Sequence, residues 1–182
     1  MNDRFIRKLL KAFTVYVIIF VLFMLLFTKV FMFNIIPSGS MENTIMTGDF
    51  VFSTRFGISE QEIQRYDIVV FIAPDDPELT YIKRVIGLPG ETIEVKDGRV
   101  YADGVELDDS FVRNPMNRKG DGVFEVPEGS FFLLGDNRNQ SQDSRFWDHP
   151  YVPVDNIKGK AKYVVLPVSN FGSIQYEKEE LN

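Results

Sequence analysis

Three short polar segments, each beside an apolar stretch, contain the side chains that could carry chemistry. Residues 36–49 (IPSGSMENTIMTGD) contain two serines separated by a glycine, and residues 81–91 (YIKRVIGLPGE) place Lys83 within an apolar run. Residues 135–147 (GDNRNQSQDSRFW) are dense in Asp, Asn, Arg and Ser. A serine beside glycine is more often a turn or capping residue than a nucleophile, and a strand lysine more often protects a sheet edge. Taken one at a time, these segments do not establish an activity.

Lys83 could serve as a general base if its amine were kept out of water. A lysine has a pKa of about 10.4, which must fall by about 2–3 units for the amine to be neutral near neutral pH. Burial among apolar neighbours, without a carboxylate partner, lowers a lysine pKa in this way. Because side chains alternate across a strand, Lys83 and Arg84 point to opposite faces, and one of the two faces the apolar side.

The third segment contains side chains that can satisfy one another's hydrogen-bonding needs. Asp143 and Arg145 have a spacing that suits a local ion pair, and the segment ends in Trp147, the only tryptophan. A loop of this composition is usually solvated, but it is also a good scaffold for a buried polar site.

Composition excludes several other kinds of site. The chain has no cysteine, which excludes disulfides, thiolate zinc sites and a cysteine nucleophile. The single histidine, His149, cannot build a multi-histidine metal site, and between Asp148 and Pro150 it is predicted to be a surface loop residue. The sequence contains no GxGxxG, Walker, HExxH, GxSxG or SxxK motif. We therefore expect neither a metal nor a cofactor.

Charge is unevenly distributed along the chain. Within residues 1–11, four Lys or Arg stand against one Asp, whereas from residue 34 onward there are 15 Lys or Arg against 25 Asp or Glu. The net negative charge of the chain from residue 34 onward would repel the phosphate backbone of a nucleic acid. The sequence also has no run of basic residues with interleaved aromatics, the pattern typical of a nucleic-acid-binding surface. Nucleic acid is therefore not an expected partner.

The basic N-terminal segment precedes a candidate membrane anchor. Residues 12–28 carry no charge, and beyond Lys29 apolar residues continue to Phe33. A helix over residues 12–33, at about 1.5 Å per residue, is long enough for the roughly 30 Å hydrocarbon core, with Lys29 reaching the headgroups. The basic residues of 1–11 predict a cytoplasmic N-terminus, so residues 34–182 would form an extracytoplasmic domain at the cell membrane. The alternative is a cleavable signal peptide with its small-x-small site at residues 38–40, although the apolar run is long for one.

After the anchor, the pattern changes to short apolar runs separated by turn residues, which predicts a twisted antiparallel β architecture. Asp97-Gly98 and Asp103-Gly104 predict type I′ hairpin turns. Residues 59–64 have a weak helical pattern, and residues 114–122 are predicted to be a loop or the edge of a small subdomain. The predicted strands are Phe50–Thr54, Asp67–Ile72, Tyr81–Ile86, Thr92–Val95, Arg99–Ala102, Ser130–Leu134 and Lys160–Val165.

In their order along the chain, the polar segments resemble the motif boxes of the bacterial type I signal peptidases. One such box is a weak signal, but four in register behind an N-terminal anchor form a specific pattern that covers most of the chain. The matching stretches are PSGSM (37–41) with Thr44 and Gly48-Asp49, DIVVF (67–71), YIKRVIGLPGE (81–91) and GDNRNQSQDSRFW (135–147).

The resemblance implies a role for each matched residue. Ser40 would be the nucleophile and Lys83 the general base that accepts its proton. Ser38 would help the Ser40 backbone amide to hold the tetrahedral oxyanion, and Ser141 would hydrogen-bond and orient the lysine amine. The implied structural supports are the pair Asp143 and Arg145, together with Gly135, Asp136, Asn137 and Arg138 at the start of the last box.

The resemblance also implies a mainly β, antiparallel peptidase domain behind one transmembrane helix. Its substrates would be signal peptides of secreted pre-proteins, bound in an extended form along a strand edge with small side chains before the cut. Membrane lipid would be its other partner, and no oligomeric state is predicted.

The chain departs from the family at Asn43, where Pro is common, and at Tyr66, where Gly is common. The short segment between residues 91 and 135 implies that any second β subdomain is small.

Two other functions remain open at this stage. A self-cleaving repressor-type protease shares the Ser-Lys chemistry, but it needs no membrane span. A catalytically inactive membrane β domain would only bind peptides, which the joint presence of Ser38, Ser40, Lys83 and Ser141 argues against.

The distance along the chain from anchor to nucleophile is short. Ser40 is seven positions after Phe33, and an extended chain covers at most about 3.3–3.6 Å per residue, so Ser40 must lie within about 25 Å of the outer membrane face. We expect apolar surface near Ser40, including Phe31 and Phe33, to enter the membrane interface.

Overall fold

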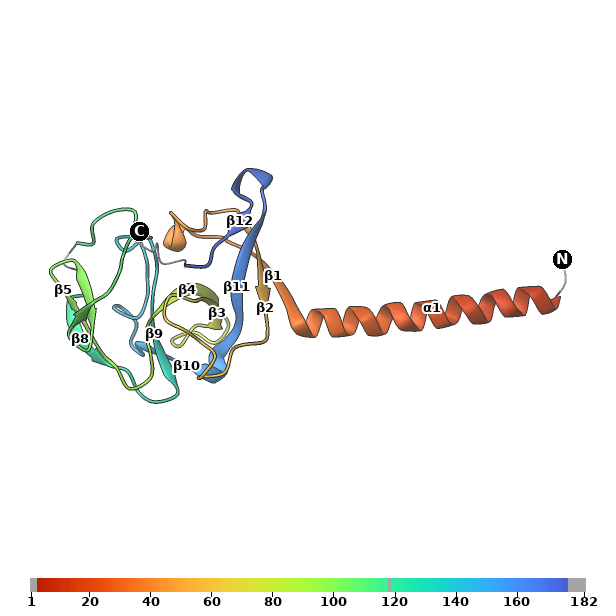
Figure 1. The fold of residues 1–182 in the computed structure, drawn as a ribbon, viewed down its shortest axis with the longest axis horizontal. Helices are drawn as coiled ribbons and strands as arrows, with labels where there is room; N and C mark the ends of the chain where they lie inside the picture. Colours follow the sequence, from red (N-terminus) through yellow and green to blue (C-terminus); the bar gives the residue numbers. More distant parts are fainter. Residues whose placement is uncertain (1–2, 118, 177–182) are drawn as a thin grey trace, which may run out of the picture.

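The computed structural model describes residues 3–117 and 119–176, which form one long helix and a β-rich body. Helix α1 (Asp3–Val30) projects from the body (Figure 1). The chain passes directly from the last residue of this helix, Val30, into the first strand. Residues 1–2 of the predicted basic segment and residues 177–182 of the predicted peptidase domain lie outside the described residues.

Eight strands form the larger sheet, and every neighbouring pair is antiparallel. The order is β1-β2-β11-β3-β4-β9-β10, with β12 paired to β11. Strand β11 therefore joins the hairpin nearest the helix to the rest of the sheet. The strands are β1 (Phe31–Ile35), β2 (Phe50–Thr54), β3 (Ile68–Ile72), β4 (Thr80–Gly87), β9 (Ser130–Leu134), β10 (Tyr151–Pro153), β11 (Ile157–Leu166) and β12 (Gly172–Ser173).

A second sheet of four antiparallel strands is inserted between β4 and β9, in the order β7-β6-β5-β8. Its hairpin turns contain Asp97-Gly98 and Asp103-Gly104, and all four of these residues have positive φ, as a type I′ turn requires. The predictions of both turns and of a small second subdomain are confirmed. The strands are β5 (Thr92–Lys96), β6 (Arg99–Ala102), β7 (Val105–Glu106) and β8 (Gly122–Glu125).

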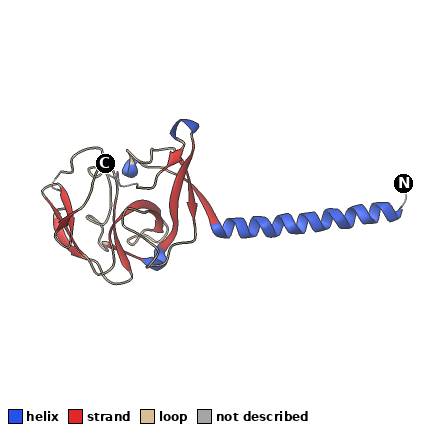
Figure 2. Ribbon diagram, in the orientation of Figure 1, coloured by secondary structure: helices blue, strands red, loops and turns tan. Residues whose placement is uncertain are grey.

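Three short 3₁₀ helices complete the described elements: η1 (Gly39–Met41), η2 (Val154–Asn156) and η3 (Val168–Asn170), shown with the other helices in Figure 2. The predicted helix over residues 59–64 is wrong, because only one turn forms there. In that turn the Ser59 carbonyl accepts hydrogen bonds from the backbone N–H groups of Glu62 and Ile63. The next strand, β3, begins at Ile68.

The mainly antiparallel β fold is confirmed, and each of the seven predicted strands overlaps an observed one. The predicted helical anchor over residues 12–33 ends too late: α1 stops at Val30, and residues 31–33 belong to β1. Apolar composition alone could not separate the two, because the outer residues of β1 are as apolar as the helix. Within the predicted loop 114–122, Gly122 starts β8 and residue 118 lies outside the described part.

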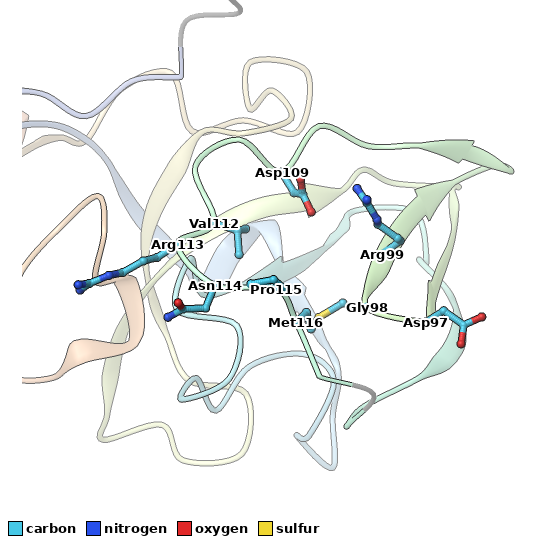
Figure 3. Close-up of a pocket in the computed structure, with 9 residues that line it drawn as sticks. All are labelled: Asp97, Gly98, Arg99, Asp109, Val112, Arg113, Asn114, Pro115 and Met116. Carbon is cyan, nitrogen blue, oxygen red and sulfur yellow. The ribbon is translucent and has the colours of Figure 1, made fainter.

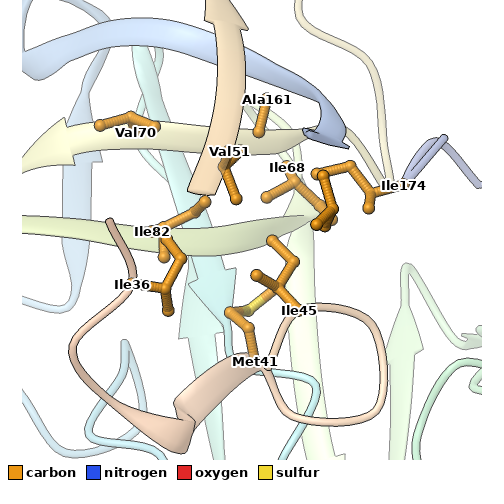
Figure 4. Packing of buried hydrophobic residues seen from close by; sticks show 10 residues of the cluster. Ile36, Met41, Ile45, Val51, Ile68, Val70, Ile82, Ala161 and Ile174 are labelled. Atoms are coloured by element: carbon orange, nitrogen blue, oxygen red, sulfur yellow. The ribbon is translucent and has the colours of Figure 1, made fainter. Parts of the chain in front are cut away.

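Three clusters of buried apolar side chains hold the body together. The cluster in Figure 4 concerns the site most directly, because it joins the segment between β1 and β2 to the inner face of the larger sheet. Met41 and Ile45 from this segment are fully buried against Val51, Ile68 and Ile82. Burying side chains of this size contributes roughly 1.5–3 kcal/mol each, so the segment is firmly packed rather than a free loop.

Candidate active site

The loop that carries Ser40 connects the two strands of the β1–β2 hairpin. We call residues 36–49, which contain the predicted nucleophile, the nucleophile loop. Within it, η1 places the Ser40 side chain over the middle of β4, where Lys83 pairs in register with Val69 of β3. Lys83 Nζ donates a hydrogen bond of 2.7 Å to Ser40 Oγ and a second of 3.1 Å to the Ile82 carbonyl. The two residues predicted to be nucleophile and base are therefore in direct contact.

The Lys83 amine is buried, and only 4% of the residue is exposed. Burial penalises the charged form and lowers the pKa of Lys83 to about 8, although Asp143 and Asp136 act in the opposite direction. The Tyr81 ring lies 5.4 Å from Nζ and is stacked on Trp147, so aromatic groups border the amine. A pKa of about 8 leaves part of the amine population neutral at neutral pH, as a general base requires.

The nucleophile loop is fixed at its base by Asp49, which is 1% exposed. The Asp49 carbonyl accepts from the Ile36 N–H at 2.9 Å, and one carboxylate oxygen accepts from the Met46 N–H at 2.8 Å. The Ile36 carbonyl in turn accepts from the Gly48 N–H at 2.8 Å. These bonds close the loop, so its ends are held together independently of the sheet.

The third polar segment, residues 135–147, supports the opposite side of the dyad. Asn137 donates through its backbone N–H to the Ser40 carbonyl at 3.1 Å, and through its side chain to the Gly39 carbonyl at 3.0 Å. Gly135 is packed so closely that a Cβ there would overlap both Ser141 Oγ and the Ser40 carbonyl oxygen. A glycine is therefore required at this position for the two loops to meet.

The predicted ion pair between Asp143 and Arg145 is present and buried. Arg145 Nε and one terminal nitrogen donate to the two Asp143 carboxylate oxygens at 2.8 and 2.9 Å. Asp143 also accepts from the Gly135 N–H at 3.1 Å, and Arg145 donates to the Arg138 carbonyl at 2.7 Å. The pair thus ties the two ends of the segment together.

Comparison with known proteins bears on this arrangement directly. Residues 6–166 match the family model described as signal peptidase, peptidase S26. The chain belongs to the signal peptidase family.

Individual members of the family are similar to most of the chain. Signal peptidase I of Leptolyngbya laminosa is 40% identical over 146 residues, which cover 76% of this chain and 70% of that protein. Probable signal peptidase I-1 of Synechocystis sp. is 38% identical over 146 residues, covering 76% and 73%. Signal peptidase I of Pseudomonas fluorescens is 34% identical over 174 residues, covering 69% of this chain and 61% of that protein. The chain therefore spans about three-fifths of the Pseudomonas relative.

A solved structure is also similar. The crystal structure of a signal peptidase I from Enterococcus faecalis V583 is 35% identical and covers 54% of this chain and 95% of that chain, with a TM-score of 0.47. The family resemblance drawn from the motif boxes is confirmed by the family model and the curated relatives, and the chain is a signal peptidase-type hydrolase.

The two accessory serines expected from the family resemblance, Ser38 and Ser141, lie in different environments. Ser38 immediately precedes η1 in an extended conformation, and its exposed hydroxyl makes no hydrogen bond within the described part of the chain. Ser141 is buried, but its Oγ has no hydrogen-bond partner among the described residues. The Lys83 amine bonds Ser40 and the Ile82 carbonyl instead, so the expected bond from Ser141 to the amine is absent from this arrangement.

Sequence reasoning missed one structural pair. Arg84 follows Lys83 and is also buried, and it makes a bidentate ion pair with Asp136 at 2.8 and 2.6 Å. Thr44 of the nucleophile loop donates to the same carboxylate at 2.5 Å. The signal was available, because a buried arginine on an apolar strand needs a carboxylate and Asp136 lies in the predicted polar segment.

Arg138, expected to be structural, lies beside this pair. It is 4% exposed, its Nε has no hydrogen-bond partner among the described residues, and its guanidinium lies 5.7 Å from the Phe111 ring. Burial lowers the pKa of Arg138 to about 10, with Asp136 opposing the effect. The group remains a cation at neutral pH and adds positive charge near Asp136.

The two departures from the family both contact one segment. Asn43 has a φ of 105° and donates to the Phe111 carbonyl at 2.7 Å. Tyr66 has a φ of 74°, a left-handed conformation that explains why glycine is common there, and its ring packs against Phe111. The contacts with Phe111 compensate for the backbone strain at these positions.

Two further features lie away from the dyad. His149 is exposed, as predicted, and its Nδ1 lies 2.9 Å from an Asp75 carboxylate oxygen. A cavity of about 300 Å³ adjoins the smaller sheet (Figure 3). No residue predicted for the active site lines it; its lining is Asp97, Gly98, Arg99, Asp109, Val112, Arg113, Asn114, Pro115 and Met116.

Proposed function

We propose that the chain is a membrane-anchored serine endopeptidase that removes N-terminal signal peptides from exported pre-proteins, with Ser40 as nucleophile and Lys83 as general base. The observation that carries the proposal is the 2.7 Å hydrogen bond between a serine hydroxyl and a buried lysine amine that has no ion-pair partner among the described residues. The substrate class comes from the relatives named signal peptidase I.

In the acylation step, neutral Lys83 Nζ accepts the Ser40 hydroxyl proton as Oγ attacks the carbonyl carbon of the scissile bond. The carbonyl oxygen becomes an oxyanion, and in this proposal the Ser38 hydroxyl and the Ser40 backbone N–H donate hydrogen bonds to it. Collapse of the tetrahedral intermediate breaks the C–N bond, and the Lys83 ammonium returns its proton to the leaving amine, which is the new N-terminus.

In the deacylation step, water attacks the ester that joins the signal peptide to Ser40. Lys83, again neutral, accepts a proton from this water, and the second tetrahedral intermediate releases the signal peptide with a carboxylate end. Ser40 Oγ takes the proton back from Lys83, so the dyad is regenerated. Both steps use one base, which is consistent with the absence of a histidine near the dyad.

The anchor is part of the same proposal. Within the described residues, one helix segment, Ile6–Val30, is long and apolar enough to cross a membrane, and none of its most apolar stretch is buried in the protein. Its 25 residues correspond to about 37 Å of helix, more than the roughly 30 Å hydrocarbon core. Cleavage at residues 38–40 would remove β1 from the sheet, which favours an anchor over a cleaved signal.

The outer face of the β1–β2 hairpin supports membrane contact beside the anchor. On a sheet, alternate residues share a face, and here that face is apolar where a soluble domain would carry polar residues. Phe33 stacks on Phe50 at 5.4 Å, and Phe31 lies 4.8 Å from Phe27 of α1. The residues of this face, which we call the hairpin face, are Phe31, Phe33, Ile35, Phe50 and Phe52.

Cleavage of a pre-protein with a small-x-small site by the full chain in detergent tests the catalytic proposal. We expect Ser40→Ala and Lys83→Ala to abolish cleavage, and Ser38→Ala to reduce kcat by about 10²–10³ because one oxyanion donor is lost. Ser59→Ala, a serine in an exposed turn, is the matched control and should retain full activity. Cleavage that persists in either dyad variant would refute the assigned roles.

The orientation can be tested separately, because the chain has no cysteine. The basic residues at the start of α1 predict that this end is cytoplasmic. We expect a membrane-impermeant maleimide to label Ser110→Cys but not Lys8→Cys in intact cells. The reverse pattern would place the dyad on the wrong side for exported substrates.

A further inference from the structure

The end of β11 carries a second apolar projection, which we call the η3 tip (residues 166–171). Val168 is 79% exposed and Phe171 is 66% exposed, on either side of the polar residues of η3. Leu166, at the start of the tip, is 52% exposed. Three large apolar side chains so close together in water are unfavourable, and such a patch marks a surface that another apolar phase covers.

The η3 tip continues the hairpin face. Leu166 of β11 pairs in register with Phe50 of β2, which pairs in turn with Ile35 of β1. A ladder of aromatic contacts leads from this row back to Phe27 of the helix through Phe33. In Figure 1 the turn at the end of β11 lies on the same side of the body as α1, at the other end of the β1–β2 hairpin. A membrane that received α1 would therefore also lie against the tip.

A polar side chain within the tip reaches the nucleophile loop. Asn170 Nδ2 donates a hydrogen bond of 2.8 Å to Asp49 Oδ1, and the two residues are 121 positions apart in the sequence. The other Asp49 carboxylate oxygen holds the Met46 N–H, and the Asp49 carbonyl holds the Ile36 N–H. Asp49 thus closes the loop that contains Ser40, and Asn170 holds Asp49 from outside that loop.

We propose that Asn170 is a positioning residue for Ser40, and that contact between the η3 tip and the lipid bilayer stabilises the arrangement in which Asn170 holds Asp49. Its catalytic consequence rests on the function proposed above. In this proposal the bilayer binds the η3 tip, and it favours the conformation in which the nucleophile loop is closed.

The physical reason is competition with water. Asn170 is exposed, so water competes for both its amide and the Asp49 carboxylate whenever the tip lies in bulk solvent. Insertion of Val168 and Phe171 into the interface removes that water and strengthens the remaining hydrogen bond. A surface that binds the ordered tip better than the frayed tip shifts the equilibrium toward the ordered one.

The first experiment measures loop closure without cleavage. The full chain is placed in vesicles of phosphatidylethanolamine and phosphatidylglycerol, and amide hydrogen exchange is followed in residues 36–49. Asn170→Ala and the double variant Val168→Ser/Phe171→Ser should each speed exchange about tenfold, the effect of losing one hydrogen bond to a charged group. The combined triple variant should be no faster than Asn170→Ala, because the tip acts through that residue. Additive effects, or an unchanged loop in the tip variant, would overturn the proposal.

Two controls separate this coupling from a general loss of structure. Val105→Ser/Val123→Ser removes two exposed valines of the smaller sheet and should leave exchange in the nucleophile loop unchanged. Asp49→Asn/Asn170→Asp exchanges donor and acceptor, and it should restore slow exchange because the new amide oxygen at position 49 could still accept from the Met46 N–H. Failure of this rescue would show that the hydrogen bond is not what couples the tip to the loop.

Lipid contact itself is measured with Phe171→Trp in the same vesicles containing brominated acyl chains. We expect strong quenching at this position and none at Val105→Trp, relative to the signal of the native Trp147. If the fluorescence of this tryptophan is not quenched, the η3 tip does not contact the bilayer and the proposal is wrong.

The catalytic consequence is read from kinetics on vesicle-bound pre-protein. In Asn170→Ala and in the tip variant, kcat should fall about tenfold while KM changes less than about twofold, because the nucleophile is misplaced and the substrate contacts remain. A larger KM change with constant kcat would show that the tip binds substrate instead. If the exchange results hold but the wild-type chain cleaves nothing, the proposed function fails and the coupling stands.

Discussion

The buried amine of Lys83 makes a prediction about both rate and stability that can be worked from the structure. Burial lowers the pKa of Lys83 from 10.5 to about 8, which corresponds to about 3 kcal/mol of preference for the neutral form. At pH 7, about one molecule in ten then has a neutral base, against about three in ten thousand for an unperturbed lysine. We expect kcat/KM to rise about tenfold per pH unit below pH 8 and to level off above it.

The same burial destabilises the folded protein in a defined pH window. Because the folded-state pKa is depressed, the unfolded chain binds this proton more tightly, and the full cost of about 3 kcal/mol is present below pH 8. Stability is regained as the pH rises from about 8 toward 10.5, where the amine is neutral in both states. Lys83→Met should therefore raise the free energy of unfolding by about 2 kcal/mol at pH 7, after allowance for the lost hydrogen bond to Ser40.

Thermal unfolding of the full chain in mild detergent, followed by near-UV circular dichroism at pH 7 and pH 10, measures this effect. Lys160→Met is the matched control, because Lys160 is also a buried strand lysine, 8% exposed, but its Nζ lies 2.6 Å from an Asp67 carboxylate oxygen. Its loss leaves a carboxylate unpaired and should lower the melting temperature, whereas Lys83→Met raises it at pH 7. If both variants lose stability at pH 7, or if the rate profile has its inflection near pH 10, the reasoning about a dry, unpaired amine is wrong.

Two further predictions concern the supports of the dyad. Gly135→Ala should reduce cleavage by about a hundredfold or more, because the new methyl group displaces the Ser40 carbonyl; an active variant with an unchanged circular dichroism spectrum would contradict this packing. Arg84→Gln should lower the free energy of unfolding by about 3–5 kcal/mol, because Asp136 is left buried without its cation. Adding Asp136→Asn to that variant should recover part of the loss, and no recovery would count against a charge-based cause.

Local patterns in the sequence predict most of the β body. The strands Phe50–Thr54, Arg99–Ala102 and Ser130–Leu134 have the predicted bounds, because alternation or a short apolar run is interrupted there by clear turn residues. Strand β1 was missed for the opposite reason. Its outward residues are as apolar as those of the helix before it, so no change in composition marks the junction at Val30.

The proximity of Ser40 and Lys83 could not be derived from the chain alone. The two residues are 43 positions apart, and their meeting depends on pairing between strands that no local pattern specifies. Only the family resemblance predicted it. The buried Arg84–Asp136 pair was missed because alternation suggests that one of two adjacent charges faces solvent, whereas β4 is covered on both faces and buries both.

The position of the nucleophile loop explains why anchor and chemistry belong to one unit. The loop is the connection of the β1–β2 hairpin, and β1 begins at the residue after α1 ends. Ser40 is therefore joined to the end of the helix by one paired strand and a closed loop, with no flexible linker in between. A strand of five residues spans about 17 Å, so the rigid path keeps the hydroxyl close to the surface that receives the helix. A tether of the same length without β1 would leave that depth free to vary, so in the proposed mechanism β1 helps to position Ser40, just as β4 positions Lys83.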